Sequence, residues 1–201
     1  MNIKDVKNVP TCKPESYLHA IFARQNELLI KYKDIEGLPD YPLDIDWGEN
    51  QVWIKDFLWR TCEEIAESME AAALGHFEHQ LEELSDALHF IVEAMILAGV
   101  DPPVWELSVY VPIGLPYSRD EYDSACLSVF FTAGMVGNCL KNKKWKQTQV
   151  PTDLKKFKLL LQETFEAVLR VFKACTCSAE DIYILYFKKS EVNKFRQRTK
   201  Y

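Results

Sequence analysis

The sequence of 201 residues has only seven glycines, and it contains no GxxxxGK(S/T) motif, the loop with which P-loop proteins hold phosphates. It also lacks an apolar run long enough to cross a membrane, because the most apolar stretch, residues 87–100, contains His89 and Glu93. The net charge of -6 at pH 7 argues against a general affinity for nucleic acid, which needs a basic surface. We therefore expect neither a nucleic-acid partner nor a membrane partner.

The N-terminal residues carry no apolar segment typical of a secretory signal. We therefore expect a cytoplasmic protein, located in the host cytoplasm if the gene belongs to a phage. In that compartment most of the six cysteines are expected to stay reduced rather than to form a disulfide framework.

Apolar residues recur at helical spacing along most of the chain, and no alternating strand pattern competes with them. This predicts an all-α fold, with residues 1–201 forming a single domain built as a bundle of about five to six helices. Asn50 is the expected N-cap of the second helix, and Val109–Val111 is expected to form a short strand or an extended loop. The first helix is expected to start near Ser16. The others are expected to span residues 51–74, 78–98, 119–140, 152–174 and 178–198.

The second and third predicted helices are separated only by a short connection around Gly75. Helices joined so closely pack as antiparallel neighbours. We therefore expect this pair to form the centre of the bundle.

Both helices of this pair carry acidic residues within otherwise apolar faces. Glu64 and Glu67 are three residues apart, as are Glu83 and Asp86, so each pair shares a helix face. Antiparallel packing can bring the two pairs together. The alternative is an ordinary acidic surface exposed to solvent, and spacing alone leaves both interpretations open.

Four carboxylates at one helix interface repel each other and lose their hydration, so they hold protons or need a cation. An all-oxygen ligand set suits Mg²⁺, for which Mn²⁺ can substitute. The pattern therefore favours a magnesium site.

The order EExxE followed by ExxD, here Glu63, Glu64, Glu67, Glu83 and Asp86, resembles the all-α nucleoside triphosphate pyrophosphohydrolase superfamily of MazG-like enzymes. The ending SAEDIYILYFKKSEVNKFRQRTKY resembles the C-terminal signature of the dimeric dUTPase and phage dCTP pyrophosphatase group. The segments ARQNELL and SDALHF are also similar to motifs of that group. Within the ending, the matching residues are Tyr186, Lys189, Asn193, Arg196, Gln197 and Tyr201.

This resemblance implies Mg²⁺-dependent hydrolysis of a deoxypyrimidine nucleoside triphosphate to the monophosphate and pyrophosphate, by a homodimer. We rank dUTP first, as the commonest substrate of the family. A phage-type dCTP or modified-pyrimidine pyrophosphatase comes second, because the QNE segment and the ending at Tyr201 look phage-like. The implied metal ligands are Glu64, Glu67, Glu83 and Asp86, and the implied catalytic residues, which orient water, are Glu63 and Glu67.

The same resemblance implies that Lys189, Asn193 and Arg196 bind phosphate. The implied nucleoside-binding residues are Gln25, Asn26, His89 and Tyr186, with Trp47, Trp53 or Phe90 as candidates for stacking on the base.

Three departures from the family pattern concern base recognition and leave the nucleobase open. Leu28 replaces an asparagine, Glu93 stands where some relatives carry a neutral amide, and Lys200 replaces the glycine before the final tyrosine. Two other classes of protein remain as alternatives. Asp86-Ala-Leu-His89 has the spacing of a di-iron bundle motif, although a second such motif is missing, and a non-catalytic helical interaction protein would carry its acids as surface residues.

Overall fold

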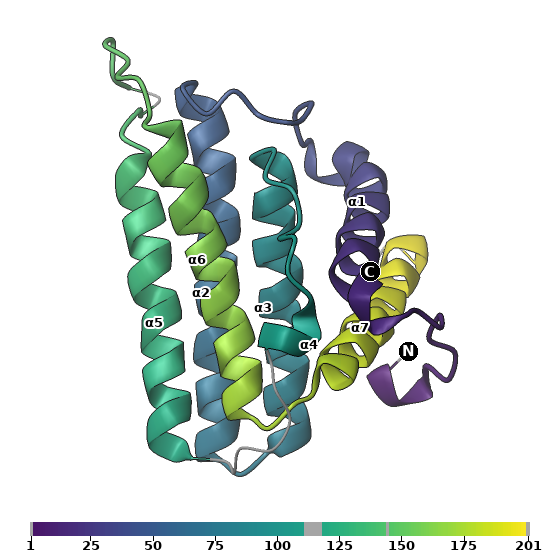
Figure 1. Ribbon diagram of the computed structural model, residues 1–201. Helices are drawn as coiled ribbons and strands as arrows, with labels where there is room; N and C mark the ends of the chain where they lie inside the picture. Colours follow the sequence, from purple (N-terminus) through teal and green to yellow (C-terminus); the bar gives the residue numbers. More distant parts are fainter. Residues whose placement is uncertain (1, 111–117, 144, 200–201) are drawn as a thin grey trace.

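A computed structural model describes residues 2–110, 118–143 and 145–199, and within these residues it contains helices and no strands (Figure 1). The all-α prediction and the expected number of long helices are confirmed. In chain order the elements are η1 (Ile3–Asp5), η2 (Pro14–Ser16), α1 (Tyr17–Glu36), α2 (Gly48–Ala73), α3 (Phe77–Leu97), the short α4 (Leu107–Tyr110), α5 (Arg119–Cys139), α6 (Leu154–Ala174) and α7 (Ala179–Thr199).

Four of the long helices, α2, α3, α5 and α6, stand side by side as a bundle (Figure 1). The other two, α1 and α7, pack against each other and against α3, at an angle to the bundle. Helix α3 therefore has neighbours on both sides and forms the junction between the two groups. None of the described helices is both long and apolar enough to cross a membrane.

The apolar faces of all six long helices meet in one large cluster of buried side chains. Its largest members are aromatic, and Phe57, Tyr122, Phe157 and Phe165 are completely enclosed. Burial of such side chains is the main favourable contribution to folding, worth roughly 1.5–3 kcal/mol for each large apolar residue. Burial of the apolar faces sets the orientation of each helix. Polar residues of α1, α2, α3 and α7 are thereby held facing one another.

The turn between α2 and α3 depends on a left-handed glycine. Gly75 has φ of 74°, its N–H donates to the Ala72 carbonyl, and the N–H of His76 donates to the Ala71 carbonyl. This pair of hydrogen bonds is the Schellman motif, which ends a helix abruptly. The chain can therefore reverse at once, and α3 lies antiparallel to α2.

Gly99 ends α3 in the same way, with φ of 62° and a hydrogen bond from Val100 to the Met95 carbonyl. A Cβ added to Gly99 would lie 2.8 Å from the Cβ of Pro42, whereas one added to Gly75 would meet nothing within 4 Å. The second turn is therefore also a packing contact with the loop that leads into α2.

Two local predictions were wrong. Helix α2 begins at Gly48 with Trp47 as its N-cap residue, so Asn50 lies in the first turn. Its side-chain amide donates to the Asp44 carbonyl at 3.0 Å, so Asn50 ties the first turn of α2 to the preceding loop. Val109 and Tyr110 belong to α4 rather than to a strand, and Leu107 at the start of this short helix is fully buried. Val111 lies outside the described residues.

Candidate functional site

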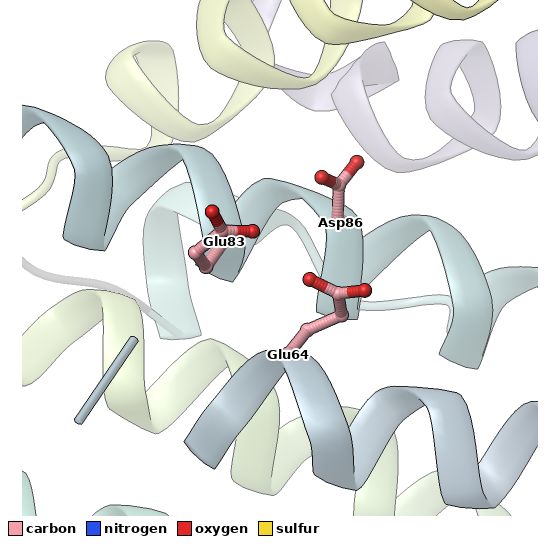
Figure 2. A group of neighbouring side chains, drawn as sticks. All are labelled: Glu64, Glu83 and Asp86. Carbon is pink, nitrogen blue, oxygen red and sulfur yellow. The ribbon is translucent and has the colours of Figure 1, made fainter. Parts of the chain in front are cut away.

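Three carboxylates of the α2–α3 pair meet in one place, which we call the acidic cluster: Glu64 of α2 with Glu83 and Asp86 of α3. One oxygen of each lies within 4.8 Å of the others, and Figure 2 shows Glu64 reaching from its helix toward the other two. Glu83 and Asp86 share a face of α3 because they are three residues apart. The antiparallel turn then presents Glu64 to that face.

The acidic cluster lies directly over the core. Its sequence neighbours Ile65, Leu84 and Ala87 are completely buried, and Glu83 itself is 8% exposed. Charged groups in such a place lose much of their hydration, and this loss is costly unless a partner compensates it. Surface acids with full access to water do not meet this problem.

The pKa values of the cluster show the same conflict. Burial raises the pKa of Glu64 well above its usual range, and a hydrogen bond with Glu83 and the charge of Asp86 raise it further. Burial also raises the pKa of Asp86 to about 6, against the opposing effect of Lys189. Such carboxyls either keep a proton or take up a cation. Oxygen ligands without sulfur or imidazole fit a hard divalent ion such as Mg²⁺.

Two side chains already contact the α3 acids. The Lys189 ammonium, from α7, lies 2.6 Å from Asp86 Oδ2, and this lysine is 7% exposed. On the other side, His79 Nδ1 lies 2.9 Å from Glu83 Oε1. The buried Lys189 thereby ties the C-terminal helix to the acidic cluster.

A pocket of about 250 Å³ opens beside the acidic cluster. Along α3 its wall carries Asp86, His89 and Glu93, which follow one another at one-turn intervals and therefore span about 10 Å of helix. We call the two extremes the acidic end, at Glu64 and Asp86, and the amide end, at Gln25, His89 and Glu93. The full lining is Gln25, Leu28, Arg60, Glu64, Asp86, His89, Phe90, Glu93, Asn193 and Arg196.

At the amide end, Gln25 of α1 is held by two hydrogen bonds. The Tyr186 hydroxyl donates to its Oε1 at 2.5 Å, and its Nε2 donates to Glu93 Oε2 at 3.1 Å. Gln25 is only 2% exposed. These bonds join α1, α3 and α7, so three helices fix one amide group in the wall of the pocket.

His89 lies next to this group, with its ring stacked on that of Tyr186 at 4.0 Å between centroids and 8° between planes. Its Nδ1 is 2.7 Å from the Ser85 carbonyl oxygen. Burial lowers the pKa of His89 to about 3, although the hydrogen bond to Ser85 acts in the opposite direction. The ring is therefore neutral at physiological pH.

Helix α7 supplies the other predicted residues. Tyr186, Lys189, Asn193 and Arg196 recur at intervals of three and four residues, so they lie along one helix face. Tyr186 is at the amide end and Lys189 at the acidic end, while Asn193 and Arg196 line the pocket. Arg196 also joins Lys189 in lining a second hollow, of about 420 Å³, against the N-terminal η1.

The remaining predicted acids are on α2 but outside the acidic cluster. Glu67 is exposed one turn beyond Glu64, and its charge is among the lesser influences that raise the pKa of Glu64. Glu63 accepts a hydrogen bond from the Trp59 indole at 2.7 Å and lines a separate groove between α2 and α5. The two candidates for orienting water therefore occupy different surroundings.

Asn26 does not line the pocket, because its Oδ1 accepts a hydrogen bond from the Tyr41 hydroxyl at 2.8 Å. Of the three aromatic candidates for stacking, Phe90 lines the pocket, whereas Trp53 packs against the core and Trp47 is 51% exposed. The side chain of Gln197, and Lys200 and Tyr201, lie outside the described residues.

Arg60 was not among the predicted site residues, and its guanidinium lies over the rings of Phe57 and Phe90 at 5.1 and 5.6 Å. Arg60 precedes Glu64 by one turn on the same helix face, and this spacing could have identified it. The di-iron interpretation gains no support, because the group of potential metal ligands found among the described residues contains three carboxylates and no histidine.

The family model described as dUTPase matches residues 70–201, more than half of the chain. The match includes Glu83, Asp86 and the residues of α7, whereas Glu64 and Gln25 precede it. Searches of curated proteins and of solved structures found no match.

Proposed function

Because the chain belongs to the dUTPase family, we propose that it hydrolyses a deoxypyrimidine nucleoside triphosphate to the monophosphate and pyrophosphate. On family grounds alone the expected substrate is dUTP. The observation that carries the proposal is the acidic cluster, whose three carboxylates lie within 4.8 Å beside a pocket. A phosphate substrate needs positive charge at this place, and the cluster can hold that charge as a metal ion.

In this proposal Glu64, Glu83 and Asp86, together with Glu67 one turn along α2, would hold Mg²⁺, and Mn²⁺ can substitute. When bound, the ion supplies positive charge that neutralises phosphate oxygens and the charge developing on the leaving pyrophosphate. The raised pKa values of Glu64 and Asp86 support this assignment, because burial disfavours both charges and Lys189 offsets this effect at Asp86 only in part.

The cationic face of α7 would hold the triphosphate. Lys189 and Arg196 supply charge, and Asn193 between them supplies an amide donor. Lys189 would turn from Asp86 to a phosphate oxygen.

Water attacks phosphorus while the anhydride bond to the leaving pyrophosphate breaks, and a carboxylate takes the proton of the water. We assign this role to Glu67, through a carboxylate oxygen that the ion does not use, because Glu67 is exposed and lies one turn from Glu64. Glu63 faces the groove between α2 and α5, with the Trp59 indole as its partner.

The amide end would receive the base, where Gln25, His89 and Tyr186 are fixed by contacts with one another or with the backbone. Phe90 offers an aromatic surface for stacking. Asn26 would act indirectly, by holding Tyr41.

The family resemblance also implies a homodimer, and one surface suits it. Trp59 of α2 is 65% exposed and lines a groove of about 530 Å³ between α2 and α5, and Leu127 and Phe131 of α5 are 62% and 69% exposed. Large apolar side chains gathered in this way are typical of an interface. Analytical ultracentrifugation of the wild type and of Phe131→Ser tests it, since loss of the dimer in the variant is expected.

The decisive experiment measures pyrophosphate release from dUTP, dCTP, dTTP, dATP and dGTP with Mg²⁺, together with Mg²⁺ binding by calorimetry. Glu64→Gln should lower turnover by about 100-fold or more, because it removes a charge that holds the ion. The control is Glu70→Gln, which changes an exposed glutamate of the same helix and should leave turnover unchanged.

Each negative result has a definite meaning. If Mg²⁺ binds but no nucleotide is hydrolysed, the assigned reaction is wrong. If no divalent ion binds and Glu64→Gln behaves as the wild type, the acids are structural and a helical interaction protein is favoured. Bound iron with an oxygen-dependent absorption spectrum would support the di-iron alternative instead.

A further inference from the structure

The hydrogen-bonding role of His89 is fixed by its surroundings. Nδ1 is 2.7 Å from the Ser85 carbonyl oxygen, which can only accept a hydrogen bond, so Nδ1 carries the proton. In the neutral ring Nε2 is then an acceptor. This atom is buried and has no hydrogen-bond partner among the described residues, although His89 lines the pocket. A buried acceptor in this position is suited to a ligand that donates.

The neighbouring residues are also oriented. Because the Tyr186 hydroxyl donates to Gln25 Oε1, the amide of Gln25 directs its Nε2 toward Glu93, which accepts. The Glu93 carboxylate can only accept hydrogen bonds, and Gln25 donates to its Oε2. Glu93 lies one turn from His89 on α3, and both line the amide end. That end therefore presents two acceptors on one helix face.

The pyrimidine bases differ in the hydrogen-bonding groups that they can present to the amide end. Cytosine carries an exocyclic amino group with two N–H donors, whereas uracil has a carbonyl oxygen at that position and a single ring N–H. A carbonyl oxygen facing His89 Nε2 and the Glu93 carboxylate would set acceptor against acceptor and would leave the buried Nε2 without a donor, and this is costly. Arg60, which also lines the pocket, can donate to the carbonyl that both bases share and so does not distinguish them.

We propose that His89 Nε2 and the Glu93 carboxylate select a pyrimidine with an exocyclic amino group, so that the site prefers a cytosine nucleotide to a uracil nucleotide. This rests on the proposed function, because it takes the pocket beside the acidic cluster as the nucleotide site. It departs from the substrate expected from the family alone.

Equilibrium binding of the product nucleotides tests the proposal without requiring hydrolysis. The wild type in Mg²⁺ should bind dCMP about 100-fold more tightly than dUMP, because a site built to accept from an N–H group rejects an analogue that lacks it. The N4,N4-dimethyl derivative of dCMP keeps the ring but has no amino hydrogens, and it should bind as weakly as dUMP. Equal or reversed affinities would overturn the proposal.

Two variants examine the named acceptors. Glu93→Gln can accept from Gln25 through its oxygen and present its NH₂ to the pocket, so it should reduce the preference for dCMP at least 10-fold and improve dUMP binding. His89→Phe keeps an aromatic ring against Tyr186 but removes Nε2, and it should weaken dCMP binding more than dUMP binding. The control, Glu70→Gln, should keep the wild-type ratio. An unchanged ratio in both pocket variants would refute the assignment.

Hydrolysis of the triphosphates separates this proposal from the proposed function. Turnover of dCTP well above that of dUTP supports both. Turnover of dUTP at least equal to that of dCTP keeps the reaction and overturns the base assignment. If neither is hydrolysed but dCMP still binds selectively, the reaction fails while the base assignment stands.

Discussion

Burial of His89 should make the free energy of unfolding sensitive to acid, because it lowers the pKa of this histidine. Its pKa in the folded protein is about 3, below the ordinary value of 6.5. Above pH 6.5 the ring is neutral in both states, so stability does not depend on it. As the pH falls below 6.5, the unfolded chain takes up a proton that the folded protein refuses, and the free energy of unfolding decreases.

The size of this loss follows from the two pKa values. Each tenfold difference in proton affinity corresponds to about 1.4 kcal/mol, so the complete effect between pH 6.5 and 3 is about 5 kcal/mol, of which about 3 kcal/mol is lost by pH 4. A domain of ordinary stability has about 5–15 kcal/mol in total. His89 alone can therefore determine where acid unfolding begins.

The assay is urea unfolding of the wild type and of His89→Phe between pH 7 and 4. The wild type should lose about 3 kcal/mol relative to the variant over this range. His19→Gln, which changes an exposed histidine, should show the wild-type profile. NMR of the imidazole nitrogens should show Nδ1 protonated and no titration of His89 above pH 4. A constant difference between wild type and variant, or titration near pH 6.5, would refute both the burial argument and the tautomer.

Two further predictions concern the acidic cluster and the helix ends. In EDTA the free energy of unfolding of the wild type should fall by about 3 kcal/mol relative to Asp86→Asn as the pH rises from 4 to above 6, because the pKa of Asp86 in the folded protein, about 6, exceeds the ordinary 3.8. Added Mg²⁺ should raise the melting temperature of the wild type only. Urea and thermal unfolding with the same pH dependence in both proteins would contradict this. Gly99→Ala should cost more than about 2 kcal/mol, since strain of a left-handed residue adds to the 2.8 Å approach to Pro42, whereas Gly75→Ala should cost only about 1 kcal/mol. Equal losses in chemical denaturation would show that the Pro42 contact is unimportant.

Periodicity predicted the helices well because each long helix buries a continuous apolar face. The acidic cluster was also predictable in part: Glu83 and Asp86 share a face by spacing, and Gly75 sets the antiparallel turn. Spacing could not show that Glu63 and Glu67 have different surroundings, because these depend on which helix packs against each side of α2. The presence of α5 beside Glu63 is a tertiary fact.

Other features depended on contacts between distant segments. Asn142 stands in a lysine-rich stretch of the sequence, yet it is 2% exposed, and its side-chain amide donates to the Asp46 and Val150 carbonyls. Asn50 is likewise predicted to cap α2, whereas in the structure its side-chain amide donates to the Asp44 carbonyl. Local rules describe what a side chain can do, and the fold decides which partner it meets.

The short turn at Gly75 has a consequence for the order in which the site is assembled during folding. The ligands of the acidic cluster belong to one helical hairpin, so only a small loop must close before they meet. By contrast, the hydrogen bond between Gln25 and Tyr186 joins residues 161 positions apart, and contacts of such long range form slowly. The acidic cluster can therefore form together with the hairpin, whereas the amide end forms only after α1 and α7 have docked. Sequence changes in α1 or α7 would then reduce base selectivity before they disturb the acidic cluster.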